Sequence, residues 1–281
     1  MNPLSHPSGA SEAAPTRANK FFRTRVTILS TILLIVILWA WRDVRSRRER
    51  NDWERPLSVA IVLVRRGSLD AEAVDAFRER IPALDARLVE ECHRYRPASV
   101  HPFVFTFFGP IDMPESLPKM AGSGLLASAR ESWALWRWTS RADRKAGLDA
   151  RIYDSRVYVV ARPPLNAQRE VVEGESEEGG RVGTVEVELD ASMADFALFV
   201  TAHELLHTLG ASDKYDSTGK TLIPSGLAEP DRDPPFPQRF AEVMARNLPV
   251  DASTERPPTS LDELGVGPVT ASEIGWLRGS R

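Results

Sequence analysis

Thiol chemistry is almost absent from this chain, whose 281 residues include a single cysteine. Cys92 has no second cysteine with which to form an intrachain disulfide, and no Cys-x-x-Cys pair is present to hold zinc through thiolates. A disulfide framework and a thiolate zinc module are therefore excluded. Any metal in this protein must be bound by histidine, aspartate or glutamate side chains.

The sequence also lacks a strong charge bias and an internal repeat. Its formal net charge is -3, and it has no basic stripe interleaved with aromatic residues, the pattern that binds single-stranded nucleic acid. No period of the length that builds solenoids or propellers is present. We therefore expect no nucleic-acid partner. The length and apolar content suffice for one sizeable globular domain and an appendage.

A long uncharged run lies near the N-terminus. Residues 1–20 are rich in proline, serine and alanine, which predicts a disordered tail, and the run from Val26 to Trp41 then contains no charge. With its flanking phenylalanines and arginines the run extends over residues 21–42, long enough for a helix to cross a bilayer. Trp39 and Trp41 stand where interfacial aromatic residues belong. We predict an uncleaved, single-pass membrane anchor.

Two other interpretations of this run are weaker. A cleaved signal peptide has a shorter apolar core followed by a small-x-small site, whereas this run ends in Trp-Ala-Trp-Arg-Asp. A buried core helix fits poorly with a run that is apolar on every side and flanked by arginines. Because positively charged residues are nearly equal in number before and after the run, the side of the membrane that carries the following domain is left open. Residues 43–55 are predicted to be a basic juxtamembrane linker, either solvated or resting on anionic head groups.

From residue 56 to residue 281, strand-like apolar runs alternate with longer helical stretches. The predicted strands are 57–64, 103–108, 151–161 and 183–189, and the first two predicted helices are 69–95 and 123–138. We expect an α+β fold, a mixed twisted sheet packed with helices. Three tryptophans of the second helix, Trp133, Trp136 and Trp138, are predicted to be packed. The acidic, glycine-rich stretch 163–180 is predicted to be a mobile surface loop.

A third helix is predicted around the most informative segment of the chain, from about residue 193 to residue 209. Ser192 and Asp195 form a capping-box-like start, and Gly210 supplies a stop. The residues between are apolar on most sides, which is typical of a helix that runs through a core. Polar side chains on such a helix need a specific partner, because burying an unsatisfied polar group is costly.

Two histidines one turn apart stand on this helix, in the sequence His-Glu-Leu-Leu-His. The nitrogens of His203 and His207 converge at the spacing that tetrahedral zinc requires. Glu204 follows the first histidine and can reach a metal-bound water rather than the metal itself. It is therefore the candidate general base, taking the proton of that water while the ion polarises the scissile carbonyl.

The third ligand is predicted beyond the end of the helix. Glycine adopts left-handed backbone conformations, so the chain can turn back at Gly210, and Asp213 then stands where a ligand from outside the helix would approach. The other interpretation of Asp213 is a solvated turn residue, in which case Glu229 or Glu242 could donate the carboxylate. Tyr215 is a candidate for oxyanion stabilisation or ligand orientation, with simple packing as the alternative.

The pattern His-Glu-x-x-His-x-x-Gly-x-x-Asp resembles that of the metzincin clan of zinc endopeptidases, and most closely its members with aspartate as third ligand, such as snapalysin. Residues 209–216, Leu-Gly-Ala-Ser-Asp-Lys-Tyr-Asp, are also similar to a run in immune inhibitor A peptidases. The specific match covers about fifteen residues. It implies a metzincin-like catalytic domain with His203, His207 and Asp213 as zinc ligands. Glu204 would be its general base.

The resemblance implies two further features. Metzincins hold the substrate backbone along an antiparallel edge strand, and the predicted strand 183–189 is the nearest candidate here. They also have a methionine turn beneath the metal, for which Met244 is the candidate. The spacing of Met244 from Phe240 and Val243 fits a core helix as well. The proline-rich interval 217–238 departs from the compact pattern of the smallest members.

The leading hypothesis from the sequence is a membrane-anchored zinc metallopeptidase with Zn²⁺ as cofactor and a protein or peptide as substrate. The alternative is a membrane-tethered binding or scaffold protein whose metal site gives stability without hydrolysis. Glu204 argues against that alternative, because a structural site needs no base and tends to have four protein ligands. Hydrolysis of a non-peptide amide is a third function compatible with the motif.

Overall fold

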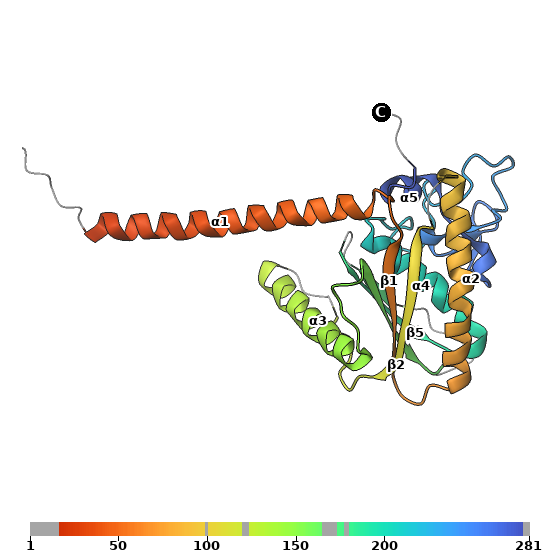
Figure 1. The fold of residues 1–281 in the computed structure, drawn as a ribbon. Coiled ribbons are helices and arrows are strands. Elements are labelled where there is room, and N and C mark those ends of the chain that lie inside the picture. The colour runs from red at the N-terminus through yellow and green to blue at the C-terminus, as the bar shows by residue number, and fades with distance from the viewer. Residues whose placement is uncertain (1–16, 99–100, 120–123, 165–172, 177–179, 278–281) are drawn as a thin grey trace, which may run out of the picture. The chain divides into compact units, whose positions relative to one another are not determined.

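The computed structural model describes residues 17–98, 101–119, 124–164, 173–176 and 180–277 (Figure 1). The chain divides into two compact units, of which the first ends at Arg48 and the second comprises Glu49–Arg281. Residues 1–16, most of the predicted disordered tail, lie outside the described residues.

The first unit consists of the helix α1 (Arg17–Arg50), whose last two residues belong to the second unit. Residues 17–20 are helical rather than part of a disordered tail. The segment Phe21–Arg42 is apolar and exposed, and it is long enough to cross a membrane. A signal sequence can have the same length and composition, so this segment is a candidate membrane span.

The second unit begins at Glu49, inside the segment 43–55 that the sequence predicts to be a linker. Of the residues 43–55 assigned to that linker, those up to Arg50 continue α1, and the last seven belong to the compact unit. Arg50 is buried and its Nη1 donates a hydrogen bond of 2.8 Å to the carbonyl oxygen of Gly180. Trp53 is buried as well, and its indole N–H donates to a backbone carbonyl 2.7 Å away. The linker prediction is therefore wrong over its second half.

A five-stranded sheet with the order β2-β1-β3-β5-β4 forms the centre of the second unit. Its strands are β1 (Leu57–Arg65), β2 (Phe103–Asp112), β3 (Ser155–Arg162), β4 (Glu173–Ser176) and β5 (Val182–Glu188). The first three and β5 run parallel, whereas β4 pairs antiparallel with β5. β1 is buried along most of its length, as its continuous Val/Ile/Leu run requires for a strand covered on both faces. The predicted mixed sheet is present, in a largely parallel α/β arrangement.

The edge of this sheet differs from the prediction. The expected edge strand, 183–189, corresponds to β5, which lies between β3 and β4 inside the sheet. The edge is β4, which falls within the stretch 163–180 that was predicted to be a loop; residues 165–172 and 177–179 of that stretch lie outside the described residues. The sequence Glu-Gly-Glu-Ser has little intrinsic preference for a strand, so β4 is formed by its pairing with β5.

Helices cover both faces of the sheet (Figure 1). Their bounds are α2 (Ala71–Tyr95), α3 (Leu125–Ala146) and α4 (Ala194–Thr208). The larger core lies on the side of α2 and α4, where Ile61 of β1 packs in one cluster with Phe77 of α2 and Leu198 of α4. A smaller core on the other face joins Val62 of β1 to Trp138 of α3. The successive residues 61 and 62 thus serve opposite faces, as the pleat of a strand dictates.

The elements that surround and follow α4 are short. They are the 3-10 segments η1 (Ala191–Met193), η2 (Val243–Ala245) and η3 (Leu261–Glu263), the paired strands β6 (Ala241–Glu242) with β9 (Leu264–Gly265) and β7 (Leu248–Pro249) with β8 (Glu255–Arg256), and the helix α5 (Pro268–Glu273). Such short pieces gain their order from tertiary contacts rather than from propensity. The region after α4 therefore depends on side-chain partners, several of which lie beside the candidate site.

The helix α3 is longer than predicted, and only part of it is packed. It continues eight residues past Trp138, which is 3% exposed and donates a hydrogen bond of 3.1 Å to the carbonyl oxygen of Glu115. Trp133 and Trp136 are 55% and 63% exposed. The N-terminal half of α3 extends away from the sheet (Figure 1). The prediction that all three tryptophans are packed is therefore wrong for two of them.

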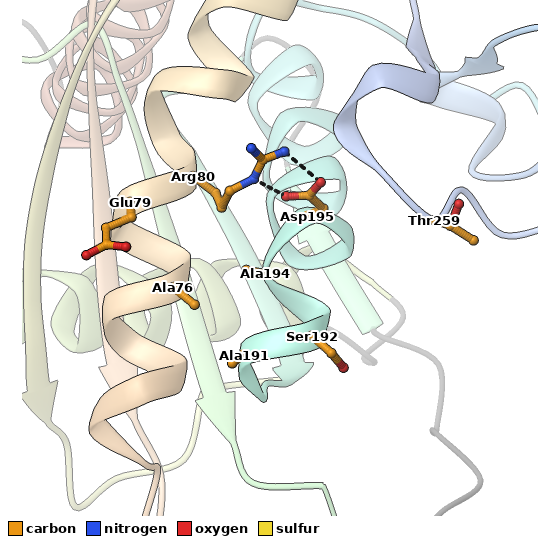
Figure 2. Close-up of a pocket in the computed structure, with 8 residues that line it drawn as sticks. All are labelled: Ala76, Glu79, Arg80, Ala191, Ser192, Ala194, Asp195 and Thr259. Carbon is orange, nitrogen blue, oxygen red and sulfur yellow. Dashed lines mark hydrogen bonds and ion pairs between the residues drawn. The ribbon is translucent and has the colours of Figure 1, made fainter.

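An ion pair, and no capping box, fixes the start of α4. The Ser192 hydroxyl donates to Asp190 at 2.6 Å, while Asp195 accepts hydrogen bonds of 2.6 and 2.8 Å from the guanidinium of Arg80 (Figure 2). Asp195 also accepts the backbone N–H of Leu261 at 3.2 Å. The N-cap of α4 is Met193 and has no side-chain capping bond, so the predicted capping box is wrong. The carboxylate instead joins α2, α4 and η3.

Replacing Asp195 with alanine removes the shared acceptor of these three elements. We expect the free energy of unfolding to fall by about 1–3 kcal/mol, because hydrogen bonds to charged groups that are partly shielded from water contribute that much. Urea unfolding of the full chain in detergent measures the change. Asp75→Ala is the matched control, since its 2.7 Å pair with Arg78 is half exposed and should contribute less than about 1 kcal/mol. Equal losses in the two variants would contradict the assignment.

Candidate metal centre

His203 and His207 lie in the buried C-terminal half of α4. They are 4% and 7% exposed, in a helix of which twelve of 15 residues are buried. One turn separates them, so both side chains leave the same face of the helix. Their Nε2 atoms are 3.1 Å apart and their rings are nearly perpendicular, at 89°. The two Nε2 atoms are therefore directed at the same small volume.

The other nitrogen of each imidazole is held by a backbone carbonyl. His203 Nδ1 lies 2.9 Å from the carbonyl oxygen of Val243, and His207 Nδ1 lies 2.7 Å from that of Ala211. A carbonyl oxygen only accepts, so each Nδ1 must carry a proton. In the neutral ring Nε2 then presents a lone pair, which is the tautomer that a metal-binding histidine requires.

Asp213 completes a triangle with the two imidazoles. Gly210 ends the helix with a φ of +96°, and the chain turns back behind it, as the sequence predicts. The Oδ1 atom of Asp213 then lies 3.3 Å from His203 Nε2 and 3.2 Å from His207 Nε2. Tetrahedral zinc with bonds of about 2.0–2.1 Å needs ligand atoms about 3.3 Å apart. The spacing of these three atoms fits such an ion.

These three atoms are all hydrogen-bond acceptors when the rings are neutral, so they repel one another unless a cation lies among them. Burial raises the pKa of Asp213, but hydrogen bonds with His203 and His207 outweigh it and hold that pKa far below its ordinary value. Burial lowers the pKa of His207, yet Asp213 and the carboxylate of Glu204 bring it above its ordinary value. The cluster thus attracts positive charge, from protons or from a metal ion.

Glu204 and Tyr215 lie at the rim of this triangle. Glu204 is 3% exposed, and its Oε1 is 3.9 Å from His203 Nε2. Ligand atoms of His203, Glu204 and His207 all lie within 4.8 Å of one another, so this buried group could bind a metal ion. The ring of Tyr215 stacks on that of His203, with centroids 6.3 Å apart. Burial and the charge of Asp213 raise the pKa of Tyr215 to about 12, so its phenol is a donor at neutral pH.

Sequence analysis missed Arg246, which lies beside Tyr215. Its guanidinium carbon is 5.3 Å from the centre of the tyrosine ring, within the range of a cation–π contact. Its backbone φ is +72°, which is uncommon for a residue other than glycine. In the sequence the residue is distinguished only by its place two positions after Met244.

The turn η2 lies against the histidines, and it is a turn rather than part of a core helix. Met244 within it is fully buried. Glu242, also fully buried, accepts the backbone N–H groups of Met244 at 2.5 Å and Gly267 at 3.2 Å. Since the carbonyl of Val243 accepts from His203, the carboxylate of Glu242 helps fix the group that orients this imidazole. Whether Met244 has the part of a methionine turn stays a prediction.

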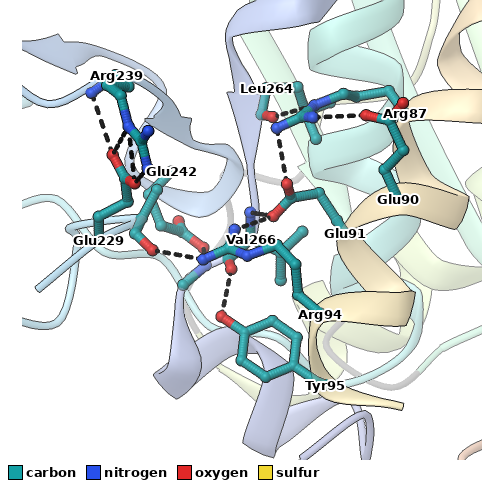
Figure 3. A network of polar contacts seen from close by, with 12 residues as sticks. Arg87, Glu90, Glu91, Arg94, Tyr95, Glu229, Arg239, Glu242, Leu264 and Val266 are labelled. Carbon is teal, nitrogen blue, oxygen red and sulfur yellow. Dashed lines mark hydrogen bonds and ion pairs between the residues drawn. The ribbon is translucent and has the colours of Figure 1, made fainter. Parts of the chain in front are cut away.

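Buried charges connect this turn to α2 (Figure 3). Glu91 is 1% exposed, and it accepts hydrogen bonds from Arg87 at 2.7 Å and from Arg94. It also accepts the backbone N–H of Val266 at 2.8 Å. The next backbone N–H along the chain, that of Gly267, donates to Glu242. A chain of hydrogen bonds therefore runs from α2 to the turn beneath the histidines.

The two alternative third ligands have other partners. The carboxylate of Glu229 pairs with the guanidinium of Arg239, whose Nε lies 3.0 Å from it (Figure 3). The carboxylate of Glu242 is occupied by backbone N–H groups. Asp213 is the carboxylate that the structure brings to the histidine nitrogens.

Comparison with known proteins gives no family for this chain. No protein-family model matches it, and no curated protein has a significantly similar sequence.

The triangle predicts the metal content of the protein. We expect about one zinc ion per full-length chain purified without chelator, as elemental analysis measures it. Asp213→Ala should weaken zinc binding by about 100-fold or more, because loss of outer partners alone weakens sites 10–100-fold. Competition with a chromogenic chelator measures the affinity. Asp216→Ala removes a nearby carboxylate that accepts only from its own loop residues, and it should bind zinc like the wild type.

Glu242→Ala tests the support beneath the site. The change leaves the N–H groups of Met244 and Gly267 buried without their carboxylate acceptor, which should cost about 2–4 kcal/mol of unfolding free energy. Glu242→Gln keeps one acceptor oxygen and should lose less. Chemical unfolding measures both variants. Glu229→Ala, which breaks an ion pair whose arginine is largely exposed, should lose at most about 1 kcal/mol. A larger loss in Glu229→Ala than in Glu242→Ala would refute the assignment.

Proposed function

We propose that this protein is a membrane-anchored zinc endopeptidase. The observation that carries the proposal is the triangle of His203 Nε2, His207 Nε2 and Asp213 Oδ1, with edges of 3.1–3.3 Å. The histidine side chains are almost fully buried, while that of Asp213 is 43% exposed. Three protein ligands and one accessible side are typical of a catalytic zinc site, whereas a structural site is closed by four.

The site residues have separable tasks in peptide hydrolysis. Zinc held by the triangle would supply a Lewis acid that polarises the scissile carbonyl and makes a water molecule acidic. Glu204 takes the proton of the attacking water and passes it to the leaving amine; its burial beside the triangle suits a group that must exchange protons at close range. Tyr215 donates a hydrogen bond to the developing oxyanion, since its raised pKa keeps the phenol protonated. Arg246 positions the tyrosine ring.

The sheet supports a metzincin-like version of this activity. β4 is an antiparallel strand at the edge next to β5, and β5 leads through η1 into α4. An edge strand can hold an extended peptide as one more strand, through main-chain hydrogen bonds. The resemblance of the motif to metzincins implies that an edge strand has this part, and we assign it to β4 because β5, the predicted strand 183–189, lies inside the sheet. The candidate span Phe21–Arg42 would hold such an enzyme at a membrane.

Glu204→Gln tests hydrolysis apart from metal binding. The amide cannot take a proton from water, so we expect turnover of a fluorogenic protein substrate to fall by about 10²–10⁴-fold. Zinc content should stay at the wild-type value, because the three ligands are untouched. Glu79→Gln, an exposed change on α2, is the matched control and should leave turnover unchanged. Full-length protein that binds zinc but cleaves no peptide library would instead favour the scaffold function.

A further inference from the structure

The outer face of α3 carries large apolar side chains that the domain does not cover. Leu126, Trp133 and Trp136 are 89%, 55% and 63% exposed. None of the residues 126–137 is buried, so more than three turns of helix contribute no fully buried side chain to the core. Exposed tryptophans grouped in this way mark an interaction surface, because a single domain gains nothing from leaving them in water.

This face has a regular composition. Leu126, Arg130, Trp133, Arg137, Arg141 and Arg144 are spaced at i, i+4, i+7, i+11, i+15 and i+18, which places them along one side of the helix. We call these six residues, with Trp136 beside them, the outer face of α3. The opposite side of the helix carries the buried Trp138 and Ala142, which pack on the sheet.

Positive charge is interleaved with the aromatic rings. The guanidinium carbon of Arg137 lies 4.6 Å from the centre of the Trp133 ring, a close cation–π contact. Arg141 is partly neutralised by Glu115, 2.5 Å from its Nη1. Glu131 follows Arg130 by one residue, so the helix turns it about 100° away from the arginine. The outer face thus combines four arginines with two tryptophans and a leucine.

We propose that the outer face of α3 lies in the head-group region of an anionic membrane. Tryptophan and arginine are the residues that favour this region, where a ring can sit between acyl chains and head groups while a guanidinium binds phosphate. Protein interfaces are also enriched in tryptophan and arginine, so the choice of a bilayer rests on the candidate span. The same chain carries the candidate span Phe21–Arg42, so a bilayer is the surface within its reach. The proposal depends on that span and is independent of the metal and of hydrolysis.

A fluorescent label on this face tests the proposal in the full chain. Ala129 is exposed and lies between Leu126 and Trp133 on the helix. Ala129→Cys, combined with Cys92→Ala to remove the native thiol, takes one environment-sensitive nitrobenzoxadiazole group. The protein is placed in nanodiscs of phosphatidylcholine, alone or mixed with phosphatidylglycerol. We expect a blue shift of the emission in the mixed nanodiscs only, and its loss at high salt, because salt screens the attraction.

Charge reversal supplies the matched comparison. Arg130→Glu with Arg137→Glu should abolish the blue shift. Arg78→Glu with Lys220→Glu changes the net charge equally at exposed positions outside α3 and should retain it. Equal emission in the two kinds of nanodisc would overturn the proposal, and so would a shift that survives reversal on α3. A shift without anionic lipid that grows with protein concentration would show contact between copies of the chain, and would also overturn it.

Discussion

Two hydrogen bonds to backbone carbonyls determine what the histidines of α4 can do. Val243 and Ala211 each offer an oxygen to an Nδ1 atom, at 2.9 and 2.7 Å, and so direct both Nε2 lone pairs toward Asp213. If either ring turned over, its protonated nitrogen would face the other ligands and the triangle would no longer attract a cation. The chemistry of the site thus depends on where two loop carbonyls lie.

Those carbonyls are held by different means. Ala211 follows Gly210, whose left-handed backbone folds the chain against the end of its own helix, so its position is a local consequence of sequence. Val243 lies 40 residues from the histidine it binds, in a turn fixed by the buried Glu242. Glu242 is linked to Glu91 of α2 through the neighbouring residues Val266 and Gly267, whose backbone N–H groups donate to Glu91 and Glu242. Burying two carboxylates is costly unless they are well bonded, and here their bonds hold the turn that orients His203 in the candidate metal site.

This difference explains how much of the structure could be predicted. The two histidines, the glycine stop and the return of Asp213 arise from residues within about three turns of one another, where spacing is informative. The strands β1 and β5 could likewise be predicted, because each is a local run of apolar residues. The edge strand β4, the ion pair of Asp195 with Arg80 and the packing of Arg50 depend on partners far along the chain. No local pattern contains them, and each was predicted wrongly or not at all.

The tryptophans of α3 show why a wrong prediction of burial is informative. Trp136 and Trp138 have the same chemistry and lie two residues apart, yet one is 63% exposed and the other 3%. Trp136 shares its side of the helix with Thr139 and Asp143, at i+3 and i+7, which are buried. Its ring is exposed because the N-terminal half of α3 extends away from the sheet (Figure 1). Composition predicts burial for both, and only the position of the sheet separates them. An aromatic residue that remains exposed after the core is complete has no role in that core. Grouped with Leu126 and Trp133 on α3, Trp136 fits the interaction surface that we propose for this helix.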